Sequence, residues 1–159
     1  MRRRAFVTRS GRDTIICILA RFPREGEVKT RLTPPLSAGE ALEMHDRFVR
    51  QTVRAARALV ATRDARAEIR TDAAFQRAAN EWIRERDIGY RYQGTGDLGA
   101  RMARAVHRVT TGPHGHPVLL MGTDCPALTA GIIGEAGAQL ARHDAVLVPV
   151  ADGGYVLLG

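Results

Sequence analysis

Short apolar runs alternate along the chain with longer segments in which apolar residues recur every three or four positions. The short runs are typical of strands, and the three-to-four spacing is typical of helices that pack on one side. The expected strands are residues 14–20, 66–70, 88–93, 117–122, 145–150 and 155–158. The expected helices are residues 38–60, 73–83, 98–109 and 130–140. This alternation predicts a three-layer α/β/α domain with a mainly parallel central sheet.

Polar residues at the expected helix starts support these boundaries. Ser37 and Glu40 have the spacing of a capping box before the first helix. The side chains placed to cap the other three helices are Asp72, Asp97 and Thr129. Residues 1–13 have no periodicity and are expected to form a basic tail, so we expect residues 14–159 to fold as a single domain.

The composition is that of a globular protein, with 45% hydrophobic and 26% charged residues. No apolar run approaches the length needed to span a bilayer, and the basic start of the chain lacks the apolar stretch of a secretory signal. The two cysteines have no metal-ligand spacing. Together these features predict a cytoplasmic protein with reduced thiols and no membrane partner.

The net charge of +7 indicates either an anionic partner, such as a nucleotide or a nucleic acid, or a general preference for arginine. Among the 24 basic residues Lys29 is the only lysine, which suggests that a compact ammonium is needed there. Four arginines recur at helical spacing, which favours a solvated helix face over a nucleic-acid surface. These four are Arg47, Arg50, Arg54 and Arg57.

Ligands of parallel α/β sheets bind outside the carboxyl ends of the strands, where this sequence has four unusual loops. The first, RFPREGEVKTRL, follows residues 14–20 and combines several cations with a glycine. Its candidate phosphate-binding residues are Arg21, Lys29 and Arg31. It lacks the glycine spacing of a Walker loop, and a solvated charged loop is an equally good interpretation.

The second loop, QGTGDLGARM, has three glycines that would let the backbone approach a ligand closely. Its candidate nucleotide-binding residues are Gln93, Gly94, Gly96, Asp97 and Gly99. The start of the following helix offers free amides to an anion, although Asp97 is also placed to occupy them as a cap. Taken alone, the loop is better interpreted as a tight strand-to-helix turn.

The third and fourth loops each carry a carboxylate. In MGTDCP, Asp124 is placed to bind Mg²⁺ or Mn²⁺ on a diphosphate, or to cap the turn before Pro126. In ADGGY, Asp152 either begins a plain hairpin turn or brings a second carboxylate to the same site. We therefore take Asp124 and Asp152 as the candidate catalytic and metal-binding residues.

The four loops in this order resemble a family of glycosyltransferase-A-like transferases, the rSAM/selenodomain-associated transferases. The matching segments are RFPREGEVKTRL, QGTGDLGARM, GTDCPALT and PVADGGYVLLG, spread over residues 14–159. The first lysine of the family's loop is Arg21 here. The resemblance also implies that family members continue for several tens of residues past the last motif, so we expect this chain to be a short form.

The family is similar in fold to nucleotide-diphospho-sugar transferases and to small nucleotidyltransferases. The resemblance implies Lys29 and Arg31 on phosphates, residues 93–99 near the base or ribose, and Asp124 on a divalent metal. Asp152 would be a second metal ligand or an acceptor-side carboxylate. The expected activity is metal-dependent transfer from a nucleotide or nucleotide-sugar donor to a small-molecule acceptor. The alternatives are a nucleotidyltransferase of the guanylyltransferase type and an inactive nucleotide-binding module.

Overall fold

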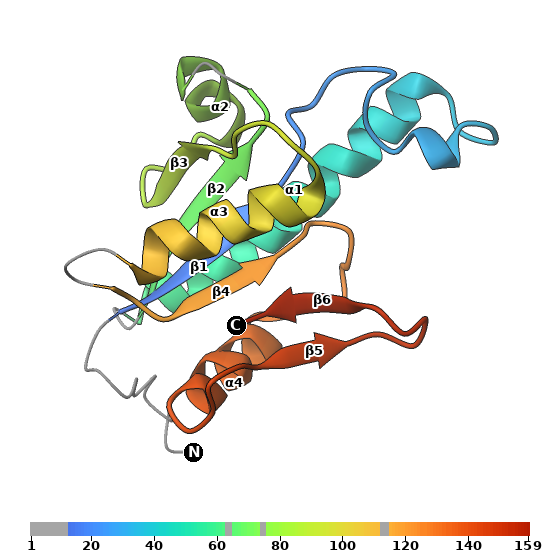
Figure 1. The fold of residues 1–159 in the computed structure, drawn as a ribbon. Helices are drawn as coiled ribbons and strands as arrows, with labels where there is room; N and C mark the ends of the chain where they lie inside the picture. Colours follow the sequence, from blue (N-terminus) through green and yellow to red (C-terminus); the bar gives the residue numbers. More distant parts are fainter. Residues whose placement is uncertain (1–12, 63–64, 74–75, 112–114) are drawn as a thin grey trace.

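The computed structural model describes residues 13–62, 65–73, 76–111 and 115–159, so the expected basic tail lies almost wholly outside the described residues. These residues form a six-stranded sheet in the order β3-β2-β1-β4-β6-β5 (Figure 1). The strands are β1 Thr14–Leu19, β2 Ala65–Thr71, β3 Ile88–Tyr92, β4 Val118–Met121, β5 Leu147–Pro149 and β6 Tyr155–Leu158. Strands β1 to β4 pair in parallel, and β6 runs antiparallel to both β4 and β5.

Four α-helices cover the two faces of the sheet unequally (Figure 1). They are α1 Ala38–Val60, α2 Gln76–Ile83, α3 Leu98–Thr110 and α4 Ala130–Leu140. Helices α1, α2 and α4 share one apolar core with the sheet, whereas α3 packs alone against β1 and β4 on the other face. The predicted α/β class with a mainly parallel sheet is confirmed.

Three of the predicted caps are present and show why the helices begin where they do. Ser37 accepts a hydrogen bond from the amide of Glu40 at 3.2 Å, and the Glu40 carboxylate accepts one from the amide of Ser37 at 2.8 Å. Asp97 accepts from the Ala100 amide at 2.8 Å. Thr129 accepts from the Ile132 amide at 3.4 Å. Each bond satisfies one of the amides that a helix start leaves unpaired.

The burial of three helix residues differs from what their hydrophobicity alone indicates. His45, a polar residue, is buried in α1. Leu98, an apolar residue at the start of α3, is 64% exposed. Ile132 is likewise exposed, and the adjacent Ile133 takes the buried position in α4. Periodicity therefore predicted the helices but not the burial of every residue within them.

Carboxylates neutralise much of the arginine stripe on α1. Arg47 pairs with Glu43 at 3.8 Å, and Arg50 pairs with Asp46 at 2.6 Å. Arg57 pairs with Glu85 at 2.7 Å and hydrogen-bonds Asp87 at 2.9 Å. This pairing favours the interpretation of the stripe as a solvated helix face.

Within the described part of the chain, no helix has the length and apolarity that crossing a membrane requires.

Candidate functional site

The four motif loops lie along one edge of the sheet. The loops that follow β1, β3 and β4 leave the carboxyl ends of parallel strands and therefore share that edge. The turn between β5 and β6 lies at the same edge, because β6 is antiparallel to β4 and begins beside the end of β4, where Leu157 pairs with Met121. Figure 1 shows this hairpin tip on the same side as the segment that follows β4.

The start of the first loop is fixed by hydrogen bonds to its neighbours. The Ala20 amide donates to the Arg70 carbonyl at 3.0 Å, which extends the pairing of β1 with β2. The Phe22 amide donates to the Asp72 carboxylate at 2.7 Å. The carbonyl of Arg21 lies 3.0 Å from Nε2 of His45. The loop therefore leaves the sheet in a direction set by β2 and α1.

An aromatic cluster beneath this loop reinforces the arrangement. The ring of Trp82 stacks against His45 at a centroid distance of 6.2 Å and meets Phe22 edge-on at 5.7 Å. Its indole N–H donates to Asp46 at 2.7 Å. Partial burial alone would raise the pKa of Asp46, but hydrogen bonds from Arg50 and Trp82 outweigh it and hold that pKa below its ordinary value.

The side chain of Lys29 bridges two of the motif loops. Its Nζ lies 2.6 Å from Oδ1 of Asp124, and 4.9 Å from the ring centroid of Phe48 on α1. The Lys29 side chain is only 11% exposed, whereas that of Asp124 is 76% exposed. The ammonium is thus held between an aromatic face and a carboxylate that itself faces solvent.

The backbone of Lys29 is left-handed, with φ 51° and ψ 31°. Residues other than glycine, asparagine and aspartate seldom adopt this conformation, and such residues cluster at functional sites. Lys29 begins the short 3-10 helix η1, Thr30–Leu32, in which the Leu32 amide donates to the Lys29 carbonyl at 2.8 Å. The side chain of Lys29 is therefore directed by a specific turn rather than by a mobile loop.

The contacts of Asp124 differ from those of a side chain that caps a turn, which was one of its two predicted roles. Besides Lys29, its Oδ1 lies 3.4 Å from the hydroxyl of the buried Thr123. Across the part of the chain that the structure describes, no backbone amide donates to its carboxylate. The sequence placed Lys29 on phosphate and Asp124 on metal as separate parts, and the structure joins them directly.

The other cations of the first loop differ in how far they are engaged. Arg21 donates to the Glu27 carbonyl at 3.0 Å, and Arg24 pairs with the Glu27 carboxylate at 3.2 Å. Both contacts tie the loop to itself. Arg31 lies exposed in η1 and forms no ion pair with any described residue. Its guanidinium is therefore available to an anion.

The glycine loop is fixed by arginines from the helix that follows it. Arg104 donates to the Gln93 carbonyl at 2.7 Å and to the Thr95 carbonyl at 3.0 Å. Arg101 donates to the Gly96 carbonyl at 2.8 Å. Gly94 has φ 82°, and a Cβ there would lie 2.3 Å from Nη1 of Arg104. Only glycine therefore allows this contact between backbone and guanidinium.

Gln93 has a structural role that the sequence did not predict. It is 4% exposed, and its backbone amide donates to the Thr71 carbonyl at 2.9 Å. In the side-chain orientation that satisfies its neighbours, its oxygen accepts from the Asp72 amide at 3.0 Å and from Arg101 at 3.2 Å. The side chain predicted to contact a base is thus engaged in joining β2, β3 and α3. Gly96 and Gly99 remain exposed, and Asp97 is engaged as the cap.

Asp152 lies in a hairpin turn, as the simpler interpretation predicted. Its Oδ1 accepts from the Gly154 amide at 3.0 Å, and Gly153 has φ 88°. Within the described ranges, no hydrogen bond or ion pair joins the Asp152 carboxylate to another motif loop. The turn brings this carboxylate to the same edge of the sheet without anchoring it to the other loops.

The described residues include no group of three or more His, Cys, Asp or Glu side chains that could hold a metal ion. A single exposed carboxylate such as Asp124 does not form a cage for a metal by itself. Mg²⁺, however, commonly binds through one or two carboxylates together with phosphate oxygens and water. Asp124 thus fits an ion that enters with a phosphate, and it does not fit a metal bound before the ligand.

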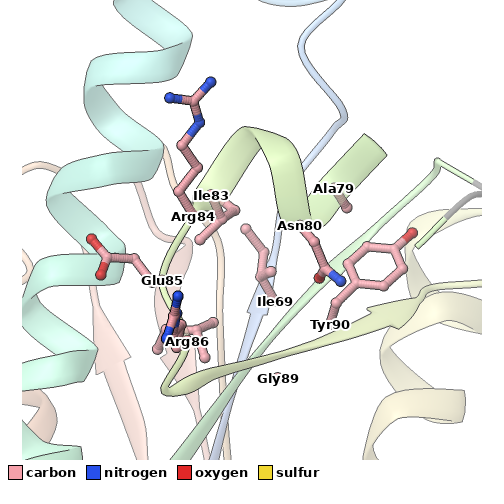
Figure 2. A pocket seen from close by; sticks show the side chains of 10 residues that line it. Ile69, Ala79, Asn80, Ile83, Arg84, Glu85, Arg86, Gly89 and Tyr90 are labelled. Atoms are coloured by element: carbon pink, nitrogen blue, oxygen red, sulfur yellow. The ribbon is translucent and has the colours of Figure 1, made fainter. Parts of the chain in front are cut away.

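A groove of about 500 Å³ lies elsewhere, between α2 and the start of β3. Figure 2 shows Ile69 and Ile83 within it and Glu85 directed toward α1, where Glu85 pairs with Arg57. None of the sequence-predicted site residues lines this groove. Its size alone therefore gives no reason to move the candidate site away from the motif loops.

Sequence reasoning missed three residues that position the site: Asp72, His45 and Arg104. Asp72 was predicted as a helix cap, yet its carboxylate holds the first loop; the residues 74–75 beside it lie outside the described ranges. Its position directly after a buried strand, like that of Asp124, was a signal that could have found it. The roles of His45 and Arg104 depend on contacts with distant carbonyls, which leave no local pattern.

The fold has a close match among solved structures. A protein from Desulfovibrio desulfuricans G20, provisionally described as a nucleotide-diphospho-sugar transferase, superposes with a TM-score of 0.81 and 27% sequence identity. The match covers 92% of this chain and 62% of that structure's chain. The search of curated proteins found no match. A family profile matches residues 52–159, and the chain therefore belongs to DUF2064, a family described as uncharacterized proteins conserved in bacteria.

Proposed function

We propose that this protein binds a nucleotide-sugar donor at the carboxyl edge of its sheet and transfers the sugar to a small-molecule acceptor. The observation that carries the proposal is the meeting of Lys29 and Asp124, a cation and a carboxylate from the loops after β1 and β4. A diphosphate bound with a divalent cation needs both kinds of group. The provisional description of the similar structure as a nucleotide-diphospho-sugar transferase adds support.

Each candidate residue has a role in this proposal. Lys29 and the exposed Arg31 bind the diphosphate and hold its charge as the sugar leaves. The exposed Gly96 and Gly99 let the nucleoside approach the backbone. Asp124 would hold Mg²⁺ or Mn²⁺, and Asp152 would be the acceptor-side carboxylate or a second metal ligand. When bound, the metal neutralises the departing diphosphate.

A second candidate is nucleotidyl transfer from a nucleoside triphosphate, the reaction of the guanylyltransferase type. Arg31 favours it, because this arginine lies close in sequence to Lys29 and forms no ion pair with any described residue, and a triphosphate carries more charge to be bound. Both activities require phosphate binding by the first loop. They therefore differ in the donor and not in the residues that bind its phosphates. A module that binds a nucleotide without turnover is the third outcome.

The donor is identified by calorimetric titration of nucleoside diphosphates, nucleotide sugars and nucleoside triphosphates, each with Mn²⁺ and with a chelator. We expect Lys29→Ala to weaken binding by about 1.5–3 kcal/mol, the scale of a charged hydrogen bond. Arg54→Ala, which removes an exposed arginine of α1, is the matched control and should change nothing. Unchanged affinity of Lys29→Ala for every ligand that binds the wild type would remove this loop from the site.

The same titrations test the metal. Asp124→Asn keeps the shape of the side chain and removes its charge. The Mn²⁺-dependent part of nucleotide affinity should then vanish, while the metal-independent part survives. Equal enhancement by Mn²⁺ in wild type and Asp124→Asn would contradict the assignment of Asp124. Product analysis with the identified donor then separates sugar transfer, nucleotidyl transfer and binding alone.

A further inference from the structure

Strand β3 forms an open edge of the sheet, and the proposed function assigns no role to it. Among the described strands its neighbour is β2, on one side. The backbone amide of Gln93, just after β3, donates to the Thr71 carbonyl of β2 at 2.9 Å. Because the polar groups of successive residues in a strand point to opposite sides, the amides and carbonyls of Tyr90 and Tyr92 face away from β2. Such an edge is a template for another strand.

A groove lies beside this strand on each face of the sheet. The groove of about 500 Å³ next to α2 has an apolar floor that includes the buried Ile69 and Ile83 (Figure 2). A second groove, of about 480 Å³, includes Glu68, which bonds Cys17 in the core beneath α3 and therefore lies on the other face. Gly89 of β3 lines both grooves. A strand added to β3 would direct its side chains alternately toward the two grooves.

Gly89 lies within β3 although the described residues around it do not require a glycine. Its φ is not positive, and an added Cβ would meet the Cβ of Glu68 at 3.4 Å, an ordinary contact. A glycine inside a strand weakens it, and it often marks a place where a ligand or another backbone approaches closely. This position therefore indicates that something outside the described residues approaches β3.

The charges beside the first groove favour an acidic partner. The two carboxylates just before β3 are already engaged, since Glu85 and Asp87 pair with Arg57 at 2.7 and 2.9 Å. The exposed Arg84 and Arg86, which line the groove, form no ion pair with any described residue. The acids at this edge are thus neutralised from within the chain, whereas the cations remain available to an anion.

The second groove has the same character. Its carboxylate, Glu68, accepts from the Arg70 guanidinium at 2.6 Å and from the Cys17 thiol at 3.2 Å. Arg91 of β3 lies 3.5 Å from the other oxygen of Glu68, and its side chain is 64% exposed. Arg91 can therefore turn to an anion outside the chain, because Glu68 keeps its other donors.

We propose that β3 binds an extended acidic segment of another protein as an additional strand of the sheet. The backbone of the segment pairs with Tyr90 and Tyr92. Its apolar side chains enter the groove next to α2, and the acidic side chains between them lie on the face of Arg91. Main-chain hydrogen bonds provide the affinity, and the alternation of apolar and acidic side chains provides the specificity.

Two other occupants match the charges poorly. A second copy of this chain, paired through its own β3, would bring Arg86 and Arg91 of the two chains together, and like charges across paired strands are destabilising. Residues 1–12 of this chain include five arginines and no acidic residue, so they would meet the same repulsion. An acidic partner avoids it.

The test titrates a capped seven-residue peptide of alternating glutamate and valine into the protein by calorimetry. The matched control peptide has the same composition, with the glutamates and valines in two blocks. We expect the alternating peptide to bind at least about fivefold more tightly than the block peptide, because only the alternating one can pair with β3 and place its valines on one face. Absence of binding by the alternating peptide, or equal affinity of the two, would overturn the proposal.

A charge-matched pair of variants locates the site. Arg86→Glu with Arg91→Glu should weaken binding of the alternating peptide by about tenfold, because two exposed ion pairs become repulsive. Arg108→Glu with Arg142→Glu makes the same change in net charge at exposed arginines that line neither groove, and should weaken it by less than about twofold. Equal weakening in both double variants would show attraction by net charge alone and would contradict the site.

Two further measurements test the strand pairing itself. Only alternate amides of the peptide can face β3, so methylation of either the valine or the glutamate amides should cost about tenfold in affinity, and methylation of the other set should cost far less. The bound peptide should also slow hydrogen exchange of the Tyr90 and Tyr92 amides and leave those of β5, the other edge strand, unchanged. Equal affinity of the two methylated forms, or unchanged exchange at both tyrosines, would exclude pairing with β3.

Sedimentation without peptide examines the second copy as occupant. We expect no dimer that protects the Tyr90 and Tyr92 amides. A dimer that does protect them, and that the Arg86→Glu, Arg91→Glu variant alters, would identify another copy of this chain as the added strand and overturn the acidic partner. None of these measurements contains a nucleotide, so their outcome is independent of the proposed function.

Discussion

The two carboxylate-bearing loops of the candidate site, at Asp124 and at Asp152, are held in different ways. Asp124 follows a buried parallel strand and binds a lysine that another loop and an aromatic ring hold in place. Asp152 bonds within its own turn, to the Gly154 amide. Loops at the ends of adjacent parallel strands can support one another, whereas a hairpin that reaches the same edge supports only itself. The following predictions test this contrast.

The largest expected effect comes from two glycines with similar backbone conformations. Gly94 has φ 82° and packs against the guanidinium of Arg104, whereas Gly153 has φ 88° and a Cβ added there would meet nothing within 4 Å. Gly94→Ala should lower the free energy of unfolding by about 2–3 kcal/mol, because it adds strain and displaces a guanidinium that bonds two carbonyls. Gly153→Ala should lower it by about 1 kcal/mol, from strain alone. Urea unfolding of both variants makes the comparison, and equal losses would contradict it.

A smaller difference is expected between the two aspartates. Asp124→Asn leaves the mostly buried ammonium of Lys29 without its carboxylate, and should lower the free energy of unfolding by about 1–2 kcal/mol. Asp152→Asn keeps an oxygen that can accept from Gly154, and should change it by less than about 0.5 kcal/mol. Thermal unfolding without ligand measures both. A silent Asp124→Asn would show that the ion pair adds nothing to stability.

The support of the first loop should depend on pH through Asp46. Because its pKa is lowered in the folded state, Asp46 stabilises the fold above its unfolded pKa of about 4, and this contribution is lost as the pH falls through the folded value. Asp46→Asn should therefore lower the free energy of unfolding by about 0.5–1 kcal/mol at pH 6 and by less at pH 3. Urea unfolding at each pH, followed by Trp82 fluorescence, measures both losses. A loss of equal size at both pH values would contradict this role of Asp46.

The smallest effect is expected on the arginine stripe of α1. Arg47→Gln with Arg54→Gln should change the free energy of unfolding by less than about 0.5 kcal/mol, because both side chains are exposed. Neither substitution should alter nucleotide affinity. Salt-dependent binding of random-sequence DNA or RNA by the wild type, lost in the double variant, would show instead that the stripe binds nucleic acid.

Much of the fold followed from local patterns in the sequence. The uninterrupted apolar runs at the positions of β1 and β4 predicted interior parallel strands, and both pair in parallel in the sheet centre. Ser37, Asp97 and Thr129 marked the helix starts because capping acts over three residues. Motif order then placed all four loops at one edge, since parallel strands share their direction.

The contacts within the site could not be predicted in the same way. Lys29 and Asp124 are far apart in the sequence, and nothing near either residue indicates that the ammonium would bind the carboxylate. Gln93 looked like a ligand-binding amide because its glycine-rich surroundings are polar, yet the bonds that engage it come from β2 and α3. Local sequence specifies which groups are present at the edge, and tertiary packing decides which of them remain available.

The antiparallel entry of β6 also bears on how the molecule can be altered. Register with β4 is set by Leu157 and Leu158, at the end of β6 that lies away from the tip at residues 150–154. Residues inserted at that tip would lengthen a projection whose base is already fixed, and loop extension of this kind is tolerated thermodynamically. The hairpin is therefore the modular part of this edge: its length and chemistry can be redesigned while the loops after β1, β3 and β4 keep their mutual fit.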